Sequence, residues 1–188
     1  MVNPTATAII AAGGRGRRLG TERPKQFLTL AGRPMLWHTL EPFSKSAFIE
    51  RIILVVPEAD IEYCQEQFDG EFSKLQRIVA AGEERDQSVA AGLAVTRADE
   101  EFVVIHDGAR PLVSTDLIQR VVVESVKYGA AIAATAAKET MKVVDGSFVK
   151  STPNRETLWC AQTPQGFRRQ LLIEASAARD PGLIPTDE

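Results

Sequence analysis

Apolar residues along the chain fall into short β-rich runs that alternate with longer amphipathic stretches. A short apolar run bounded by turn residues is typical of a buried strand, whereas apolar residues that recur every three or four positions are typical of a helix. The pattern predicts strands at residues 6–11, 51–56, 76–80, 102–105 and 130–136. It predicts helices at residues 35–46, 58–68, 84–95 and between Ser114 and Gly129.

The alternation of strands and helices indicates the fold class. Successive strand–helix units form a mostly parallel sheet with right-handed crossovers and helices on both faces. We therefore predict a single α/β domain over residues 1–188, arranged as a three-layer sandwich. In such sheets ligands bind outside the carboxyl ends of the strands, so the loops after the predicted strands are the places to search for chemistry.

Three residues mark expected helix ends. Pro34 lies near the first turn of the helix at 35–46, where the missing N–H costs little. Ser114 suits an N-cap, and Gly129 stands where a C-cap glycine belongs.

The alternation breaks after residue 136. Residues 141–144 and 148–149 flank Asp145-Gly146, a turn signal that predicts a β-hairpin. A lone hairpin is too small to bury a core. It is therefore either a decoration of the sheet edge or an arm that reaches a partner subunit.

Composition limits the classes of function. The 188 residues are 44% hydrophobic and 25% charged, which is enough for one domain with a proper core. A net charge of -3 argues against a general nucleic-acid binder, so any anion site must be local. The sequence contains no apolar run of about 18 residues, so it predicts no membrane helix. The N-terminus lacks the features of a signal peptide. Cys64 and Cys160 lack metal-site spacing and are interpreted as ordinary thiols of a reducing compartment, so we expect a cytoplasmic protein.

A glycine- and arginine-rich loop follows the first predicted strand. Residues 11–20 read AAGGRGRRLG, and Pro24-Lys25-Gln26 comes soon after. Glycines let the backbone approach phosphates, and arginine and lysine add donors and charge. The loop therefore predicts a polyphosphate site, and its place directly after a buried strand disfavours the alternative of a solvated surface loop.

Two other phosphate motifs fit this loop poorly. The dinucleotide pattern G-x-G-x-x-G fails because Gly20 is out of step with Gly14 and Gly16, and Pro24 opposes an immediate helix. The P-loop pattern fails because Gly20-Thr21 lacks the required lysine.

The loop after the strand at 102–105 reads HDGARP. A carboxylate just past a strand end is suited to hold Mg²⁺ beside phosphates, and Arg110 could pair with a phosphate. Asp107 alone would favour a turn or capping role, but Asp107 and Arg110 together favour function. His106 is interpreted as a packing or hydrogen-bonding residue rather than a base, and His38 as structural.

The loop after the strand at 76–80 reads AGEERDQS over residues 81–88. Its glycine can serve a nucleobase or cap a helix, and periodicity alone favours capping. Arg85 is interpreted as a surface or salt-bridge residue.

These loops carry a resemblance to a known family. The segments AAGGRGRRLGTERPKQF, AAGEERDQSVAAGL, VIHDGARP, KETMK and WCAQTPQGF closely resemble 2-C-methyl-D-erythritol 4-phosphate cytidylyltransferases of the non-mevalonate isoprenoid pathway. The family loop usually reads P-A-A-G-x-G-x-R-M-G, so the differences here are small, and Gly108 replaces a usual alanine. The resemblance implies a Rossmann-like sandwich and transfer of CMP from CTP to methylerythritol phosphate, with Mg²⁺.

The resemblance also implies roles for individual residues. Arg18 and Lys25 would be the catalytic cations at the α-phosphate, which leaves Arg15, Arg17 and Arg23 as surface charges. The cytidine and phosphate site would be lined by Ala12, Gly13, Gly14, Gly82, Glu83 and Ser88. Asp107 would lie by Mg²⁺ and substrate, and methylerythritol phosphate would be surrounded by Arg110, Thr140, Arg155 and Thr163. In the family the hairpin arm, here residues 138–158, is exchanged across a homodimer, so Thr140 and Arg155 would act on the neighbour's site.

The family pattern continues beyond a T-D-D/E segment, matched here by residues 186–188, to a K-x-T motif that supplies another lysine. Either the sequence is part of a longer protein or the site is incomplete, and Thr186 or Asp187 as an unused N-cap favours the former. Two alternatives to the main hypothesis stay open. One is a cytidylyltransferase for another polyol phosphate such as ribitol 5-phosphate, and the other is a non-catalytic nucleotide-binding fragment.

Overall fold

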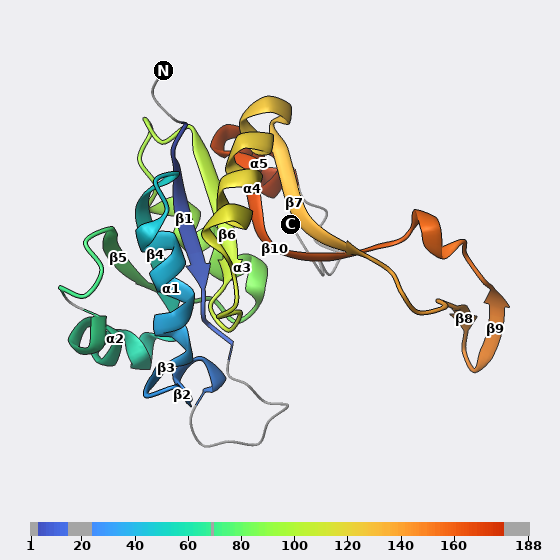
Figure 1. The fold of residues 1–188 in the computed structure, drawn as a ribbon, viewed down its shortest axis with the longest axis horizontal. Helices are drawn as coiled ribbons and strands as arrows, with labels where there is room; N and C mark the ends of the chain where they lie inside the picture. Colours follow the sequence, from blue (N-terminus) through green and yellow to red (C-terminus); the bar gives the residue numbers. More distant parts are fainter. Residues whose placement is uncertain (1–3, 15–23, 69, 179–188) are drawn as a thin grey trace.

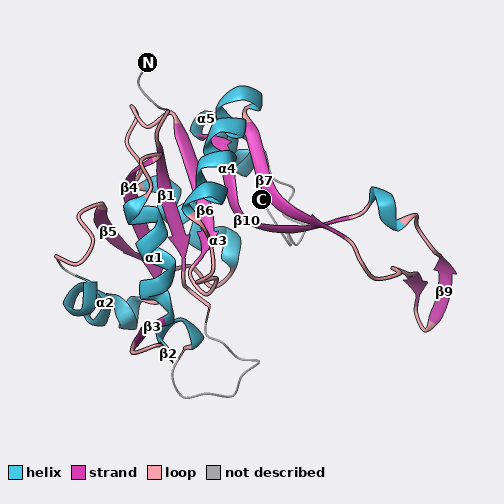
Figure 2. Cartoon of the chain, viewed as in Figure 1, coloured by secondary structure: helices cyan, strands magenta, loops and turns pink. Residues whose placement is uncertain are grey.

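A six-stranded sheet in the order β5-β4-β1-β6-β10-β7 forms the centre of the molecule (Figures 1 and 2). The computed structural model describes residues 4–14, 24–68 and 70–178. The strands are β1 (Ala6–Ala11), β4 (Ile49–Val56), β5 (Leu75–Ala80), β6 (Phe102–Asp107), β7 (Ala130–Ala136) and β10 (Trp159–Arg168). β1 pairs in parallel with β4 and β6, and β4 pairs in parallel with β5. β10 is antiparallel to both β6 and β7, so the predicted mostly parallel sheet is confirmed with one reversed strand.

Helices cover both faces of this sheet. They are α1 (Met35–Lys45), α2 (Ile61–Phe68), α3 (Arg85–Ala94), α4 (Thr115–Tyr128) and α5 (Arg169–Ala177). Because successive strand residues point to opposite faces, Ile9 and Ile10 of β1 enter different cores. Ile10 packs in the core shared with α1, α2 and α4, whereas Ile9 packs in the core shared with α3 and α5. The Rossmann-like three-layer sandwich is therefore confirmed.

The structure confirms the helix ends that were predicted from capping residues, at both ends of α4 and at the start of α1. The Ser114 Oγ accepts a hydrogen bond from the Leu117 N–H at 3.1 Å. Gly129 ends α4 with φ 87°, a left-handed conformation that glycine adopts without steric cost. Pro34 is the residue that precedes the first turn of α1.

The predicted helix at 58–68 is present as the single turn η3 (Glu58–Asp60) followed by α2. Several short elements were not predicted, and the first is the turn η2 (Lys25–Phe27). A small hairpin of β2 (Thr29–Leu30) and β3 (Arg33–Pro34) follows η2.

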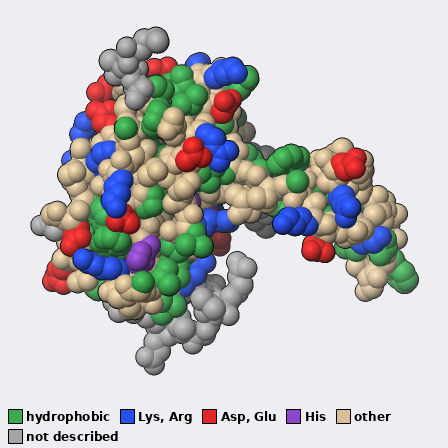
Figure 3. Space-filling view, viewed as in Figure 1, with side chains coloured by type: hydrophobic (Ala, Val, Ile, Leu, Met, Phe, Trp, Pro, Cys, Tyr) green, Lys and Arg blue, Asp and Glu red, His purple; other side chains and the backbone are tan. Residues whose placement is uncertain are grey.

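The predicted hairpin is present and stands away from the rest of the chain (Figures 1 and 3). β8 (Val143–Asp145) and β9 (Phe148–Ser151) form a two-stranded sheet of their own, joined at Gly146 with φ 57°. Every residue of these strands is exposed, and 81% of the Phe148 surface faces solvent. Since it does not pair with the central sheet, the hairpin is not a decoration of the sheet edge.

Two further expectations concern the chain as a whole. Cys64 and Cys160 are both free thiols, as predicted. Among the described residues, no helix is both long and apolar enough to span a bilayer.

Candidate active site

The glycine loops after β1, β5 and β6 meet at the carboxyl edge of the sheet. A Cβ added at Gly13 would lie 2.4 Å from the Ala81 Cβ and 3.0 Å from the Ser88 Oγ, so the loops after β1 and β5 are in direct contact. A Cβ added at Gly108 would lie 2.6 Å from the Ala12 Cβ, so the loop after β6 touches the same segment. The structure therefore brings the predicted nucleotide loops together, and glycines make the close approaches possible.

The loop before α3 is fixed by Gln87. Its Oε1 accepts from the backbone N–H of Glu83 at 2.8 Å and of Glu84 at 3.4 Å, and Glu84 is the N-cap of a full capping box. Helix capping at this loop is thus observed, but the cap is Glu84 rather than the predicted glycine. Gly82 packs directly against Gln87. A Cβ added at Gly82 would lie only 2.3 Å from the Gln87 Cβ, so a larger residue does not fit there.

We expect Gly82→Ala to displace Gln87 and to loosen the loop. Forcing a methyl group into a filled space typically lowers the free energy of unfolding by about 1–3 kcal/mol. Urea denaturation measures this loss, and Gly14→Ala is the matched control because a Cβ at Gly14 meets no atom of the described residues within 4 Å. Equal stability of the two variants would contradict the close packing described for Gly82.

Lys25 is held beside the end of β1 by its neighbours. The Gln26 Nε2 donates to the Ala12 carbonyl at 2.7 Å, and Gln26 is only 1% exposed. Phe27 is buried and packs edge-on against Tyr63. The side chain of Lys25 itself is exposed in the part of the chain that the structure describes, and its turn η2 lies next to Ala12 at the start of the glycine loop. Gln26 was missed as a positioning residue, since nothing in the pattern distinguishes it from a surface glutamine.

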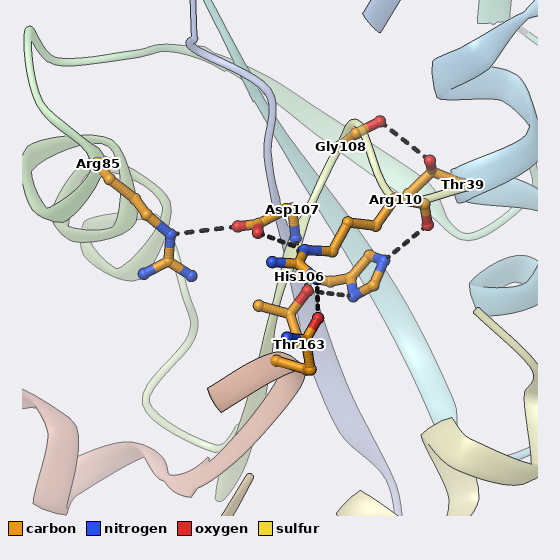
Figure 4. Close-up of polar contacts among 8 residues, drawn as sticks. Thr39, Arg85, His106, Asp107, Gly108, Arg110 and Thr163 are labelled. Atoms are coloured by element: carbon orange, nitrogen blue, oxygen red, sulfur yellow. Dashed lines mark hydrogen bonds and ion pairs between the residues drawn. The ribbon is translucent and has the colours of Figure 1, made fainter. Parts of the chain in front are cut away.

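Asp107 lies between two arginines at the end of β6 (Figure 4). The Arg85 Nε is 3.1 Å from Oδ1, and the Arg110 Nε is 2.8 Å from Oδ2. Burial alone would raise the pKa of Asp107, but the hydrogen bond from Arg110 and the charge of Arg85 outweigh it and lower the pKa below its ordinary value. Asp107 is therefore a carboxylate at neutral pH, and the salt-bridge interpretation of Arg85 is confirmed.

Arg110 also contacts Gln162 of β10, through its guanidinium and the Gln162 Oε1. This contact joins the loop after β6 to the strand that leads back from the hairpin. Gln162 was missed because the sequence predicted no strand there, and without that strand Gln162 has no place near Arg110.

His106 and Thr163 form a buried pair beneath Asp107 (Figure 4). The Thr163 Oγ1 is 2.9 Å from the His106 Nδ1, and the His106 Nε2 is 3.2 Å from the Arg110 carbonyl. Burial lowers the pKa of His106 to about 4, so its imidazole is neutral at pH 7. The prediction that His106 makes hydrogen bonds is confirmed. His38, which was predicted to be structural, lies on α1, and its Nε2 is 2.6 Å from the Leu30 carbonyl oxygen.

Other predicted site residues lie elsewhere. Arg18, with Arg15, Arg17 and Arg23, falls outside the described residues, as do residues 186–188. Thr140 and Arg155 are exposed and belong to the segment that carries the hairpin. The Arg155 Nη1 donates to the Lys138 carbonyl at 3.3 Å, and Arg155 begins the turn η4 (Arg155–Thr157). Among the described residues, neither side chain makes a hydrogen bond or ion pair with Asp107.

A divalent cation has few protein ligands at this edge. Among the described residues no cluster of three or more His, Cys, Asp or Glu could hold a metal ion. Asp107 offers a carboxylate, but both of its oxygens pair with arginines. The residues therefore fit Mg²⁺ that is held mainly by phosphate oxygens and water with one carboxylate contact, and they do not form a dedicated metal cage.

Comparison with known sequences identifies relatives over nearly the whole chain. The profile of the family described as IspD, 2-C-methyl-D-erythritol 4-phosphate cytidylyltransferase, matches residues 6–188. The enzyme of that name from Geotalea uraniireducens is 41% identical over 187 residues, which cover 97% of this chain and 80% of the relative. The one from Desulforamulus reducens is 43% identical over 185 residues, which cover 96% of this chain and 79% of the relative.

Solved structures of proteins with these names are also similar to this chain over nearly its whole length. The crystal structure of 4-diphosphocytidyl-2C-methyl-D-erythritol synthase from Anaerococcus prevotii matches with a TM-score of 0.85 at 30% identity, covering 98% of this chain and 81% of that one. The 2-C-methyl-D-erythritol 4-phosphate cytidylyltransferase of Thermus thermophilus matches with a TM-score of 0.72 at 31% identity, covering 98% and 80%. With its motifs assembled on the fold of these relatives, the chain belongs to the 2-C-methyl-D-erythritol 4-phosphate cytidylyltransferase family.

Proposed function

We propose that this protein transfers CMP from CTP to 2-C-methyl-D-erythritol 4-phosphate, giving 4-diphosphocytidyl-2-C-methyl-D-erythritol and pyrophosphate. Membership of the family supports the proposal. The observation that carries it is the meeting of the loops after β1, β5 and β6 at one sheet edge, beside Asp107 and Arg110. That edge is where α/β sheets bind nucleotides.

The nucleotide side of the site consists of the glycine loops. Backbone N–H groups exposed by glycine can cradle phosphates and can approach a base closely. The proposed cytidine and phosphate ligands are Ala12, Gly13, Gly14, Gly82, Glu83 and Ser88. Lys25 and Arg18 stabilise the charge that develops on the α-phosphate.

The reaction is an in-line displacement at phosphorus. A phosphate oxygen of methylerythritol phosphate forms a new bond to the α-phosphorus, and the bond from that phosphorus to the β-phosphate oxygen breaks. The attacking oxygen is already anionic, so positioning and charge neutralisation matter more than a general base. This requirement agrees with a site in which the one nearby histidine of the described residues, His106, is buried and neutral.

Mg²⁺ is the proposed cofactor, and it would neutralise charge on the triphosphate and on the leaving pyrophosphate. Asp107 would contribute one carboxylate oxygen. For that contact, Arg85 or Arg110 would release the oxygen that it holds in the present structure.

The acceptor side contains Asp107 and Arg110, with Thr163 beneath them. We propose that Thr140 and Arg155 join it from a second subunit, because their segment extends away from the sheet in Figure 1. Apolar side chains on the same segment support a subunit contact, since Val144, Phe148 and Trp159 are 60%, 81% and 64% exposed. The protein would then be one domain over residues 1–188 with residues 138–158 as a dimerisation arm, acting in the cytoplasm on small molecules rather than nucleic acids.

Exchange of the arm predicts complementation between two impaired variants. Lys25→Ala damages the body of the site, and Arg155→Ala damages the arm. In a mixed dimer with exchanged arms, one site keeps both residues, so co-expression should restore about one quarter of wild-type activity if subunits pair at random. A co-expressed mixture that is no more active than the two separate variants would show that each subunit uses its own arm.

The choice of acceptor separates the main proposal from its nearest alternative. Purified protein is incubated with CTP, Mg²⁺ and either methylerythritol phosphate or ribitol 5-phosphate, and pyrophosphate release is measured. We expect release with methylerythritol phosphate and at most a small fraction of that rate with ribitol 5-phosphate. Binding of CTP with no release in either mixture would favour a non-catalytic nucleotide-binding protein.

A further inference from the structure

Gln26 holds the peptide at which β1 runs into the glycine loop. Its Nε2 donates to the Ala12 carbonyl at 2.7 Å, and a carbonyl can only accept a hydrogen bond, so the amide nitrogen is the group that faces it. Gln26 and Ala12 are 1% and 4% exposed, so water does not compete for this bond. Since an unpaired buried carbonyl is costly, the bond fixes the orientation of the peptide between Ala12 and Gly13.

The orientation of that peptide also sets the direction of the Gly13 N–H. A planar trans peptide points its C=O and its N–H to opposite sides. The preceding peptide shows this geometry, because the Ala11 carbonyl accepts from the loop after β6 at 2.8 Å and the Ala12 N–H donates to the Val55 carbonyl of β4 at 2.7 Å, on the other side of β1. With the Ala12 carbonyl turned toward Gln26, the Gly13 N–H is turned away from it.

The Gly13 N–H lies among the loops that are proposed to bind CTP. A Cβ at Gly13 would be 3.0 Å from the Ser88 Oγ, so the backbone of Gly13 packs against the first turns of α3. Within residues 4–14, 24–68 and 70–178, no acceptor is found for the Gly13 N–H. A backbone N–H in a glycine-rich turn can donate to an oxygen of a phosphate or of a nucleobase. The side of the peptide that Gln26 does not occupy therefore suits a nucleotide.

Gln26 also follows Lys25, the proposed catalytic cation, directly in the chain. The turn η2 is closed by a hydrogen bond from the Leu28 N–H to the Lys25 carbonyl at 3.1 Å. Phe27, the last residue of the turn, is 2% exposed and packs against Tyr63. The turn is thus fixed to the core, and the Gln26 amide fixes the start of the glycine loop to the turn.

We infer that Gln26 is a positioning residue for the nucleotide: it holds the Ala12 carbonyl so that the Gly13 N–H faces CTP, and it keeps this loop in place relative to Lys25. The inference rests on the proposed function, because CTP is taken as the ligand. Gln26 acts through the Ala12–Gly13 peptide rather than by touching the nucleotide, since its side chain is buried against a protein carbonyl. A glutamine that only filled space beside Ala12 would leave the Gly13 N–H unaffected.

Selective labelling makes this one peptide visible by NMR. With ¹³C at the alanine carbonyl and ¹⁵N in glycine, only Ala–Gly pairs give a signal, and the chain has four of them, at 12–13, 31–32, 81–82 and 91–92. Ala31→Ser, Ala81→Ser and Ala91→Ser assign three signals and leave the fourth to 12–13. That signal reports the Ala12 carbonyl and the Gly13 N–H together.

Addition of CTP and Mg²⁺ without acceptor should shift the Gly13 N–H of the wild-type protein, along with the 81–82 signal of the second nucleotide loop. Gln26→Met keeps the length of the side chain but removes the donor. In this variant the Ala12 carbonyl carbon should move to lower chemical shift before CTP is added, as expected for a lost hydrogen bond. CTP should then shift the 81–82 signal but not the Gly13 N–H, while unchanged 31–32 and 91–92 signals show that the variant is folded.

Kinetics give the functional readout. We expect Gln26→Met to raise the KM for CTP about 10-fold and the KM for methylerythritol phosphate less than about 2-fold, because the lost hydrogen bond orients a donor to the nucleotide. Gln119→Met, the same substitution at an exposed glutamine of α4, is the matched control and should leave both values unchanged.

The outcomes separate the inference from the proposed function. An unchanged Ala12 carbonyl signal in Gln26→Met, or a Gly13 N–H that responds to CTP equally in variant and wild type, would overturn the positioning role. A wild-type protein in which CTP shifts the 81–82 signal but not the Gly13 N–H would overturn it without any variant. If CTP shifted neither signal in the wild-type protein, the proposed function itself would fail.

Discussion

Replacing Lys25 with alanine is expected to lower kcat by about 10²–10³-fold, the usual cost of one preorganised charge contact to a transition state. The expectation follows from how the residue is held. Gln26 and Phe27 anchor the turn η2 to the protein, and Gln26 ties it to Ala12, so the backbone of Lys25 is held next to the start of the glycine loop. Steady-state kinetics with CTP and methylerythritol phosphate measure the loss, and Arg18→Ala should fall by a similar factor.

The loss of kcat in Lys25→Ala reports on catalysis only if the stability of the variant is unchanged. The Lys25 side chain is exposed, so its removal should change the free energy of unfolding by less than about 0.5 kcal/mol. Lys45→Ala is the matched control, because Lys45 is an exposed lysine that pairs with Glu41 on the surface of α1. Turnover near the wild-type rate in Lys25→Ala would remove Lys25 from the catalytic machinery.

Acidification from pH 6.5 to pH 4 should remove about 3 kcal/mol of folding free energy through His106 alone. Burial lowers the pKa of His106 from an ordinary 6.5 to about 4 in the folded chain. The unfolded chain therefore takes up a proton first as the pH falls. The stabilisation from neutral His106 is complete above pH 6.5 and is lost as the pH approaches 4.

Urea denaturation at several pH values measures this slope. Asp107 and Glu71 have pKa values below their ordinary values of 3.8 and 4.5, so their own losses begin near those ordinary values and continue in more acidic solution. His38→Gln should retain the wild-type slope between pH 6.5 and pH 4, and His106→Gln should flatten it. Equal slopes in the two variants would mean that His106 is not buried and neutral as described.

Much of the fold was predictable because its elements carry regular patterns. The continuous apolar run of β1 and the helical spacing of α4, with Ser114 and Gly129 at its ends, specify their elements locally. Strand β10 was not predicted, because Pro164 and Gly166 interrupt a run that also contains polar Gln162 and Gln165. Its pairing with β6 and β7 is a tertiary interaction that local propensity does not encode, and α5 follows directly from it.

The candidate site was predictable at its glycines and charges and less so at its supports. Asp107 and Arg110 lie beside a glycine at the end of a predicted strand, and this pattern indicates a functional site in the sequence alone. The contacts of Gln26 with Ala12 and of Gln162 with Arg110 join segments distant in the chain, and a glutamine has no distinctive pattern. One partner of His106, Thr163, lies on β10, so His106 could be predicted to form hydrogen bonds but its partners could not.

Phosphorus NMR of the protein with CTP, Mg²⁺ and methylerythritol phosphate tests the central proposal most directly. We expect pyrophosphate and a new diphosphate-linked product to appear together in equal amounts, and only when methylerythritol phosphate is present. Bound CTP that stays intact in the complete mixture, or equal product formation with ribitol 5-phosphate, would contradict it.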